Sequence, residues 1–162
     1  MASKDNRADM VSESSSEVDF PGYDFDPAKL KLQVRVKLAA NRESVDPVVT
    51  QVMDTIRQVN CVDGREDAIE LALHEALANA VVHGAKEDPS KVVECLVACD
   101  EERGIIIIVR DPGPGFDPEA IPSCTVGENV YSNHGRGIFL INQLMDEVKF
   151  HKNGAEIHMV KH

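Results

Sequence analysis

The sequence contains few aromatic residues, no tryptophan and no long hydrophobic run. Phe, Trp and Tyr make up 4% of the 162 residues, so the core of any folded domain must consist mainly of Val, Ile, Leu and Ala. The longest apolar run, residues 105–109, is far too short to span a bilayer. Because the N-terminus also lacks the apolar segment of a signal peptide, the sequence predicts a cytoplasmic protein.

Cysteine and basic residues are scarce as well. The four cysteines include no C-x-x-C pair, which predicts free thiols in a reducing compartment; they are Cys61, Cys95, Cys99 and Cys124. Acidic residues outnumber basic ones and give a net charge of -11, which argues against electrostatic binding to nucleic acid or to acidic membranes. A protein partner with a basic surface would be compatible with this charge.

Hydrophobic patterning divides the chain into an N-terminal tail and one domain. Residues 1–28 are rich in serine and acidic residues without sustained periodicity, which predicts a disordered tail. Residues 29–162 carry elements in the order strand, helix, helix, strand, strand, loop, helix, strand, strand. This order predicts an α+β fold, a two-layer sandwich in which helices cover one face of a mixed, mostly antiparallel sheet. The final hairpin has Asn153-Gly154 as a predicted type I′ turn.

The central helix, predicted over residues 64–83 and ended by Gly84, carries polar side chains on an otherwise apolar surface. Glu75 and Asn79 are four residues apart and share one face of the helix, and His83 continues the same row. A carboxylate and an amide in such surroundings require hydrogen-bond partners or a functional role. On this stretch alone, the polar edge of an amphipathic helix is an adequate alternative.

Two glycine-containing clusters follow in the second half of the chain. Asp111 ends a buried strand and is followed by Gly113 and Gly115. Gly135 and Gly137 begin the last predicted helix, where free backbone N–H groups and the helix dipole favour an anion. Each cluster alone has an ordinary explanation as a turn or a hinge. Their joint occurrence after the polar pair of the central helix, in this order, is much less expected by chance.

With these three clusters the sequence resembles the GHKL ATPase superfamily, which includes gyrase-type topoisomerases, histidine kinases and anti-sigma-factor kinases. Residues 75–80 (E-A-L-A-N-A) match its N box, residues 111–115 (D-P-G-P-G) its first glycine box, and residues 135–138 (G-R-G-I) its second. The resemblance covers about residues 30–161. It implies a Bergerat-type ATP-binding fold, with ATP and Mg²⁺ as ligands. The alternating βα order and P-loop of other nucleotide-binding folds are missing.

The resemblance also implies roles for individual residues. Asn79 would ligate the Mg²⁺ that bridges the phosphates, and Glu75 would be the general base. Asp111 would accept a hydrogen bond from the adenine amino group, whereas guanine has an acceptor at the corresponding position. Gly113 and Gly115 would allow the backbone to pass close to the nucleotide.

By the same resemblance, residues 118–134 would form the ATP lid, and Gly135 and Gly137 would donate N–H groups to the phosphates. Because the protein is acidic, positive charge at the phosphates would have to come from Mg²⁺, a helix N-terminus and a few basic side chains. Further candidate contacts of the nucleotide are His83, Lys86, Arg136 and Ile138.

Within the superfamily, the chain is most similar to the anti-sigma-factor serine/threonine kinases. A sensor histidine kinase needs an upstream helical hairpin with a phosphoacceptor histidine, and gyrase-like members carry a further domain and a longer lid. The resemblance implies an anti-sigma factor that binds a sigma factor, often as a homodimer, and phosphorylates an anti-anti-sigma (STAS-type) partner. Glu75 would take the proton of the acceptor hydroxyl. No direct contact with nucleic acid or a membrane is expected.

Some positions depart from the family pattern, and alternatives stay open. Ala155 stands where many relatives have a threonine that helps to hold adenine, and residues 133–134 lack the arginine common before the second glycine box. A nucleotide-binding regulator without efficient phosphoryl transfer, or another GHKL ATPase or histidine-kinase-like protein, would fit the same motifs. A zinc hydrolase is suggested by His74-Glu75, but Ala78 occupies the second histidine position of H-E-x-x-H.

Overall fold

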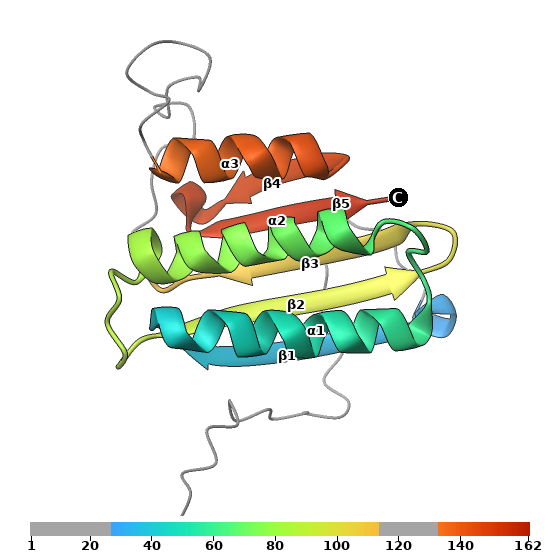
Figure 1. The fold of residues 1–162 in the computed structure, drawn as a ribbon, viewed down its shortest axis with the longest axis horizontal. Coiled ribbons are helices and arrows are strands. Elements are labelled where there is room, and N and C mark those ends of the chain that lie inside the picture. The colour runs from blue at the N-terminus through green and yellow to red at the C-terminus, as the bar shows by residue number, and fades with distance from the viewer. Residues whose placement is uncertain (1–26, 114–132) are drawn as a thin grey trace, which may run out of the picture.

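A computed structural model describes residues 27–113 and 133–162, which form one sheet with helices packed against it (Figure 1). The strands are β1 (Leu32–Ala39), β2 (Val92–Asp100), β3 (Gly104–Arg110), β4 (Glu147–His151) and β5 (Glu156–Lys161). The helices are α1 (Val45–Val59), α2 (Glu66–Asn79) and α3 (Asn133–Leu144), with short helical turns at Pro27–Lys29, Arg42–Ser44, Ala80–Gly84 and Lys152–Gly154.

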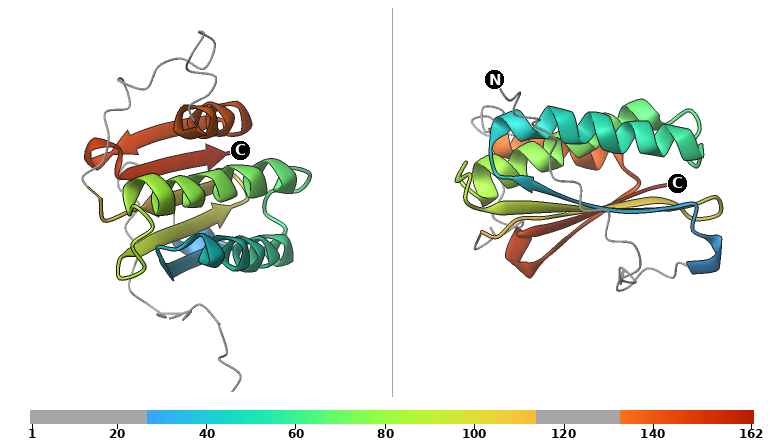
Figure 2. Two further views of the ribbon diagram at one scale, coloured as in Figure 1. Left: turned by 60° about the vertical axis from the view of Figure 1, so that its left-hand side comes forward. Right: turned by 90° about the horizontal axis from the view of Figure 1, so that it is seen from below.

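The strand order in the sheet is β1-β2-β3-β5-β4, and α1, α2 and α3 lie on one face of it (Figure 2). The predicted α+β class, the two layers and the order of elements are therefore confirmed. Every pairing between the described strands is antiparallel, so the sheet is not mixed. The predicted tail falls outside the described residues except for its last two positions, and the predicted lid does so except for its last two. No helix in the described part of the chain has the length and apolarity to cross a membrane.

The main core lies between the helices and the sheet. Alternation in β1 turns Val36 and Leu38 toward the helices, and α1 contributes its apolar stripe to the same cluster, including Met53 and Ile56. A second, smaller cluster lies on the outer face of the sheet; it consists of Leu96, Ala98, Ile106, Ile108 and Val160. Apolar residues on both faces explain why β2 and β3 read as continuous hydrophobic runs.

The central helix is less regular than the sequence predicts, and it begins at Glu66, two residues after the predicted start. After α2 ends at Asn79, the chain continues as one π-helical turn, Ala80–Gly84, in which Ala85 N–H donates to Ala80 O at 2.8 Å. Gly84 is therefore the last residue of a wide turn and not a helix stop. Such π turns are frequent at functional sites, and hydrophobic periodicity gives no signal for them. The last helix also differs, because α3 begins at Asn133, before the predicted start at Gly135.

The predicted hairpin between β4 and β5 is confirmed in its register. Phe150 pairs with Ile157. At the turn, Asn153 and Gly154 have φ values of 56° and 84°, as the two central residues of a type I′ turn require.

The cysteines differ from the sequence expectation. Cys61, in the loop between α1 and α2, forms a disulfide with Cys99 near the end of β2, so the prediction of free thiols is wrong for this pair. The two lie 38 positions apart in sequence but 6.5 Å apart between their Cα atoms, a proximity that only the tertiary fold creates. Cys95 is a buried thiol whose pKa burial raises to about 12, and Cys124 lies outside the described residues.

Candidate functional site

The three motifs meet at one end of the sheet, where β3 ends and β5 begins. This end is the left edge of Figure 1, where the last turns of α2 and the first turn of α3 also lie. A cavity of about 330 Å³ opens there between these elements. Polar or small residues on its wall are Asn79, His83, Gly84 and Lys86 from α2 and the turn after it, Asp111 after β3, and Gly154 and Ala155 from the final hairpin.

The polar pair of the central helix packs against the second glycine box. A Cβ atom added to Gly137 of α3 would lie 2.9 Å from both Asn79 Nδ2 and Glu75 Oε2, closer than real Cβ contacts allow. Gly137 therefore lets α3 approach the two polar side chains of α2. As the fifth residue of α3 it lies beyond the four free N–H groups of the helix start, whereas Gly135 is among them. Its predicted role as an N–H donor to phosphate remains untested.

A second close approach joins the π turn to the first glycine box. A Cβ atom added to Gly84 would overlap the carboxylate of Asp111, and one added to Gly113 would overlap the carbonyl oxygen of Gly84. Neither glycine has a positive φ, so space, not backbone conformation, requires them. The close approach of Gly84 to Asp111 was not predicted from the sequence. The only signal was its position directly after the polar row of the central helix.

Asp111 is held at the cavity by backbone contacts. Its N–H donates to Ala155 O at 2.9 Å, and its Oδ1 accepts the N–H of Gly113 at 2.8 Å. Burial raises the pKa of the Asp111 carboxyl above its ordinary value, and the hydrogen bond from Gly113 only partly opposes this effect. No side-chain cation among the described residues pairs with Asp111, so a donor from a ligand would relieve the cost of its burial.

The rest of the cavity wall is apolar and suits a flat aromatic ring. It is formed by Ala76, Ala80, Val109, Ile138, Ile141, Phe150 and Ile157. These residues come from α2 and the π turn after it, from β3, from α3 and from the final hairpin, and of them only Ile138 was a predicted site residue. The others follow the ordinary core pattern of their elements, so the sequence contains no sign that they face a cavity. An apolar slot with one directional acceptor, Asp111, fits a purine base.

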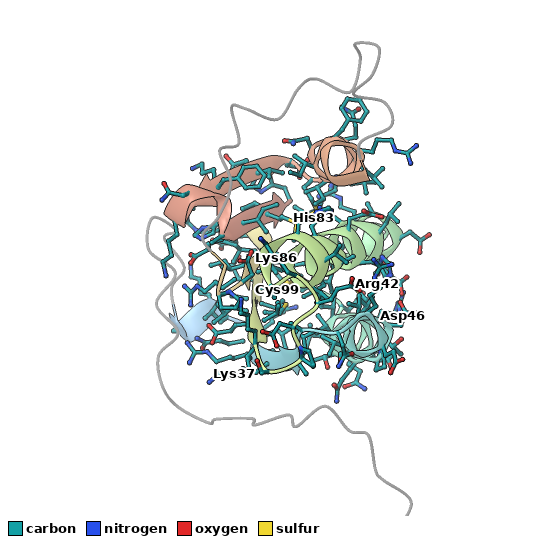
Figure 3. All side chains as sticks on the ribbon, turned by 90° about the vertical axis from the view of Figure 1, so that its left-hand side faces the viewer. Lys37, Arg42, Asp46, His83, Lys86 and Cys99 are labelled. Atoms are coloured by element: carbon teal, nitrogen blue, oxygen red, sulfur yellow. A yellow bond between two sulfur atoms is a disulfide. The ribbon has the colours of Figure 1, made fainter. Side chains whose placement is uncertain are left out.

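Among the described residues, the basic side chains that line the cavity come from the end of the central helix and the loop after it. His83 and Lys86 line it and lie at the end of the central helix that faces the viewer in Figure 3. Arg136 is exposed on α3 and is not part of the wall. Gly115 lies outside the described residues.

Glu75 faces a neighbouring hollow and not the main cavity. This second hollow, of about 380 Å³, is lined by Glu75 and by Asn79 and His83, which also line the main cavity. On its outer side His74 Nε2 and Asp46 Oδ1 are 3.0 Å apart. Asn79 thus stands at the boundary between a slot for a base and a more open hollow beside a carboxylate.

The donor atoms at this boundary suit Mg²⁺ bound together with a polyphosphate. Mg²⁺ prefers oxygen ligands and typically binds through one or two protein groups, substrate phosphates and water. The Asn79 amide and the Glu75 carboxylate, which both lie close to Gly137, provide such oxygens. Within residues 27–113 and 133–162, no three His, Cys, Asp or Glu side chains gather as a metal-binding group, so the zinc-hydrolase alternative gains no donor set there.

Comparisons with known proteins agree with this geometry. The sequence model of the family described as "Histidine kinase-like ATPase domain" matches residues 38–161. The serine-protein kinase RsbW of Staphylococcus epidermidis is 31% identical over 139 residues, which cover 80% of this chain and 86% of the relative. The serine-protein kinase RsbW of Bacillus subtilis is 28% identical over 138 residues, which cover 80% and 84%. That of Staphylococcus aureus (strain JH9) is 37% identical over 108 residues, which cover 62% and 67%.

Proposed function

Because the chain belongs to the histidine kinase-like ATPase domain family, we propose that it is an ATP-dependent serine/threonine protein kinase of the cytoplasm that acts as an anti-sigma factor. It binds a sigma factor, as a possible homodimer, and phosphorylates a STAS-type anti-anti-sigma partner. One observation supports the proposal: a largely apolar cavity with the Asp111 carboxylate on its wall opens beside the Asn79 amide, and Glu75 lines the adjoining hollow. The serine-protein kinases at 28–37% identity support the reaction class.

In this proposal Asp111 selects adenine. Its carboxylate accepts a hydrogen bond from the exocyclic amino group, while the apolar walls of the cavity sandwich the ring. A guanine would present an acceptor to the same carboxylate, leaving a buried charge without a donor. The close packing of Gly84 and Gly113 on Asp111 supports this role, because it fixes the carboxylate in position.

The phosphates lie toward Asn79 and the start of α3. The amide oxygen of Asn79 would hold Mg²⁺, which would supply charge neutralisation at the phosphates. Gly135 donates one of the free N–H groups of the helix start, where the helix dipole favours an anion. Lys86 and His83, from the turn that follows α2 and the loop after it, add further donors to the cavity.

Glu75 acts as the general base. It lines the hollow next to Asn79, so a hydroxyl of a protein substrate can enter that hollow without displacing the base of the nucleotide. Glu75 takes the proton of the substrate hydroxyl as the hydroxyl oxygen bonds to the γ-phosphorus of ATP, and the bond from that phosphorus to the β–γ bridging oxygen breaks to release ADP. Positioning supplies most of the rest of the rate enhancement.

The test compares binding and transfer in matched variants. The parent protein is expected to bind Mg-ATP more tightly than Mg-GTP in calorimetry and to transfer radiolabel to a STAS-type partner. Glu75→Gln should keep ATP affinity within about 2-fold but lose transfer by about 100-fold or more, since a general base contributes about 10²–10⁴ in rate. Asn79→Ala should abolish Mg²⁺-dependent binding. Glu70→Gln, which removes an exposed carboxylate of α2 that pairs with Arg57, should leave both unchanged. If neither ATP nor GTP bound to the protein, the proposal would be refuted.

A second function is favoured by one residue of the cavity wall. Ala155 lines the slot with a methyl group, where a hydroxyl could hold the base. Weaker retention of the nucleotide would suit a regulator that binds ATP without efficient transfer. If ATP binds and the label is not transferred to any STAS-type partner, this regulatory function replaces the kinase; if Ala155→Thr then strengthens ATP binding, the missing hydroxyl is the reason.

A further inference from the structure

A row of charged residues crosses the whole sheet directly beside the candidate site. The strand register places one such residue of each strand side by side, on the outer face of the sheet. In sheet order they are Lys37 of β1, Glu94 of β2, Arg110 of β3, Glu156 of β5 and His151 of β4. The signs alternate along the row if His151 is counted as a cation. This row has no role in the proposed function.

Arg110 is the centre of this row. Its Nη1 donates to Glu94 Oε1 at 3.0 Å, and its Nε donates to Glu156 Oε2 at 2.8 Å. The guanidinium therefore bridges β2 and β5 across β3, a geometry that a planar fork of donors allows and a single ammonium does not. Glu156 is 4% exposed and also contacts His158 Nε2 at 2.6 Å.

Arg110 lies one residue before Asp111, the residue proposed to recognise the base. Asp111 follows Arg110, and Ala155 precedes Glu156, so the Asp111 N–H to Ala155 O bond is the next step of the same ladder. Both residues line the cavity from the other face of the sheet. Beyond this bond β3 has ended, so the position of Asp111 depends on how firmly the last paired row is held.

We propose that Arg110 is a positioning residue for recognition of the nucleotide base. By clamping Glu94 and Glu156, it fixes the end of β3 against β2 and β5 and thereby orients the Asp111 carboxylate in the slot. A half-buried ion pair of this kind often adds little net stability compared with apolar residues, whereas defining one arrangement of neighbouring strands is a role such groups can have. The inference rests on the proposed function, since it assumes that Asp111 selects adenine.

The experiment compares Arg110→Met with Arg35→Met. Arg35 is the matched control, because it lies on the same outer face, 3.9 Å from the same Glu94, but on β1, two strands away from Asp111. Calorimetry with Mg-ATP and Mg-GTP should show about a 10-fold loss of ATP affinity in Arg110→Met and little change for GTP, so the ATP preference falls by the same factor. Arg35→Met should keep the preference of the parent. Equal losses for both nucleotides, or an unchanged preference, would overturn the proposal.

A second readout does not depend on nucleotide. In the ligand-free protein, the amide of Asp111 should exchange with solvent faster in Arg110→Met than in the parent or in Arg35→Met. The amide of Ile105, at the opposite end of β3, should not change. If the parent binds neither nucleotide, the proposed function fails while this exchange rate still decides whether Arg110 orders Asp111. If Arg110→Met does not fold, Arg110→Lys replaces it, because a lysine can bond only one of the two glutamates well. The Asp111 amide should then exchange faster than in the parent by a smaller factor. An exchange rate equal to that of the parent would refute the proposed positioning role of Arg110.

Discussion

Two carboxylates at the same end of the sheet have pKa values shifted in opposite directions, although burial acts on both in the same sense. Asp111 faces the cavity on the helical side, and its pKa is raised because burial outweighs the hydrogen bond from Gly113. Glu156 lies on the outer face. Burial opposes its ionisation too, but hydrogen bonds from His158 and Arg110, the charge of Arg110 and a contact with Lys152 lower its pKa to about 2. The outer carboxylate is saturated by protein donors, whereas the inner one leaves acceptor capacity unused.

This difference distinguishes a polar group that stabilises the fold from a polar group that is available to bind a ligand. A buried charge that the fold fully satisfies contributes to stability near neutral pH, because its ionised form is favoured in the native state. A buried charge that the fold leaves partly unsatisfied costs stability and gains a partner only when a ligand donates to it. Glu156 belongs to the first kind and Asp111 to the second, although the Asp111 amide is bonded to Ala155, the residue directly before Glu156.

The largest effect is expected on the acid stability contributed by Glu156. Its pKa falls from 4.5 in the unfolded chain to about 2 in the fold, a difference of about 3 kcal/mol. A lowered carboxyl pKa gives stability that is fully present above pH 4.5 and lost as the pH falls toward 2. Urea unfolding at pH 7 should therefore show Glu156→Gln to be about 2–3 kcal/mol less stable than the parent, and this gap should close near pH 2.

A glutamate on the surface provides the control for this measurement. Glu102 pairs with Lys29 at 3.5 Å, and its side chain is 72% exposed. Glu102→Gln should change the free energy of unfolding by less than about 1 kcal/mol at any pH, as exposed ion pairs do. If Glu156→Gln and Glu102→Gln behaved alike, the saturated environment assigned to Glu156 would be wrong.

The inner carboxylate should give the reverse pattern. Asp111→Ala is expected to lower ATP affinity by about 100-fold, because the exocyclic amino group of adenine would be buried without its charged acceptor. Because the Asp111 carboxyl has a raised pKa, its removal should cost little stability in the ligand-free protein. Calorimetry and urea unfolding on the same sample measure both quantities.

Asp100 is the matched control for Asp111. It also ends a strand and accepts backbone N–H groups in the turn that follows, from Glu102 and Arg103, but it lies at the opposite end of the sheet. Asp100→Ala should therefore lower stability and leave ATP affinity unchanged. The prediction is wrong if Asp100→Ala lowers ATP affinity and Asp111→Ala lowers only stability.

Much of the fold could be predicted from the sequence because its signals are local. Alternation in β1, the apolar runs of β2 and β3 and the Asn153-Gly154 turn each specify an element or a register without reference to the rest of the chain. The predicted order of elements and the final hairpin register are confirmed for this reason. The Cys61–Cys99 disulfide and the π turn could not be predicted, because both depend on contacts between elements.

The candidate site was predictable only in part, for the same physical reason. Asn79, Asp111 and Ile138 were found through motifs and do line the cavity, together with His83. The apolar wall, for example Phe150, follows an ordinary strand pattern and gives no separate signal. Arg110 and Glu156 are ordinary strand charges in the sequence, and only the register across β3 and β5 shows that they meet.

The smallest effect is expected for a substitution that adds only a methyl group beside Asp111. A Cβ at position 84 would overlap the Asp111 carboxylate, so Gly84→Ala should displace that group and lower ATP affinity by about 10-fold, less than its removal would. Gly64→Ala is the control, since a Cβ there meets nothing within 4 Å but the residue has a φ of +81°. It should cost about 1 kcal/mol of stability through backbone strain and leave ATP affinity unchanged. If Gly84→Ala also lost only stability, the contact between the π turn and Asp111 would have no part in binding the nucleotide.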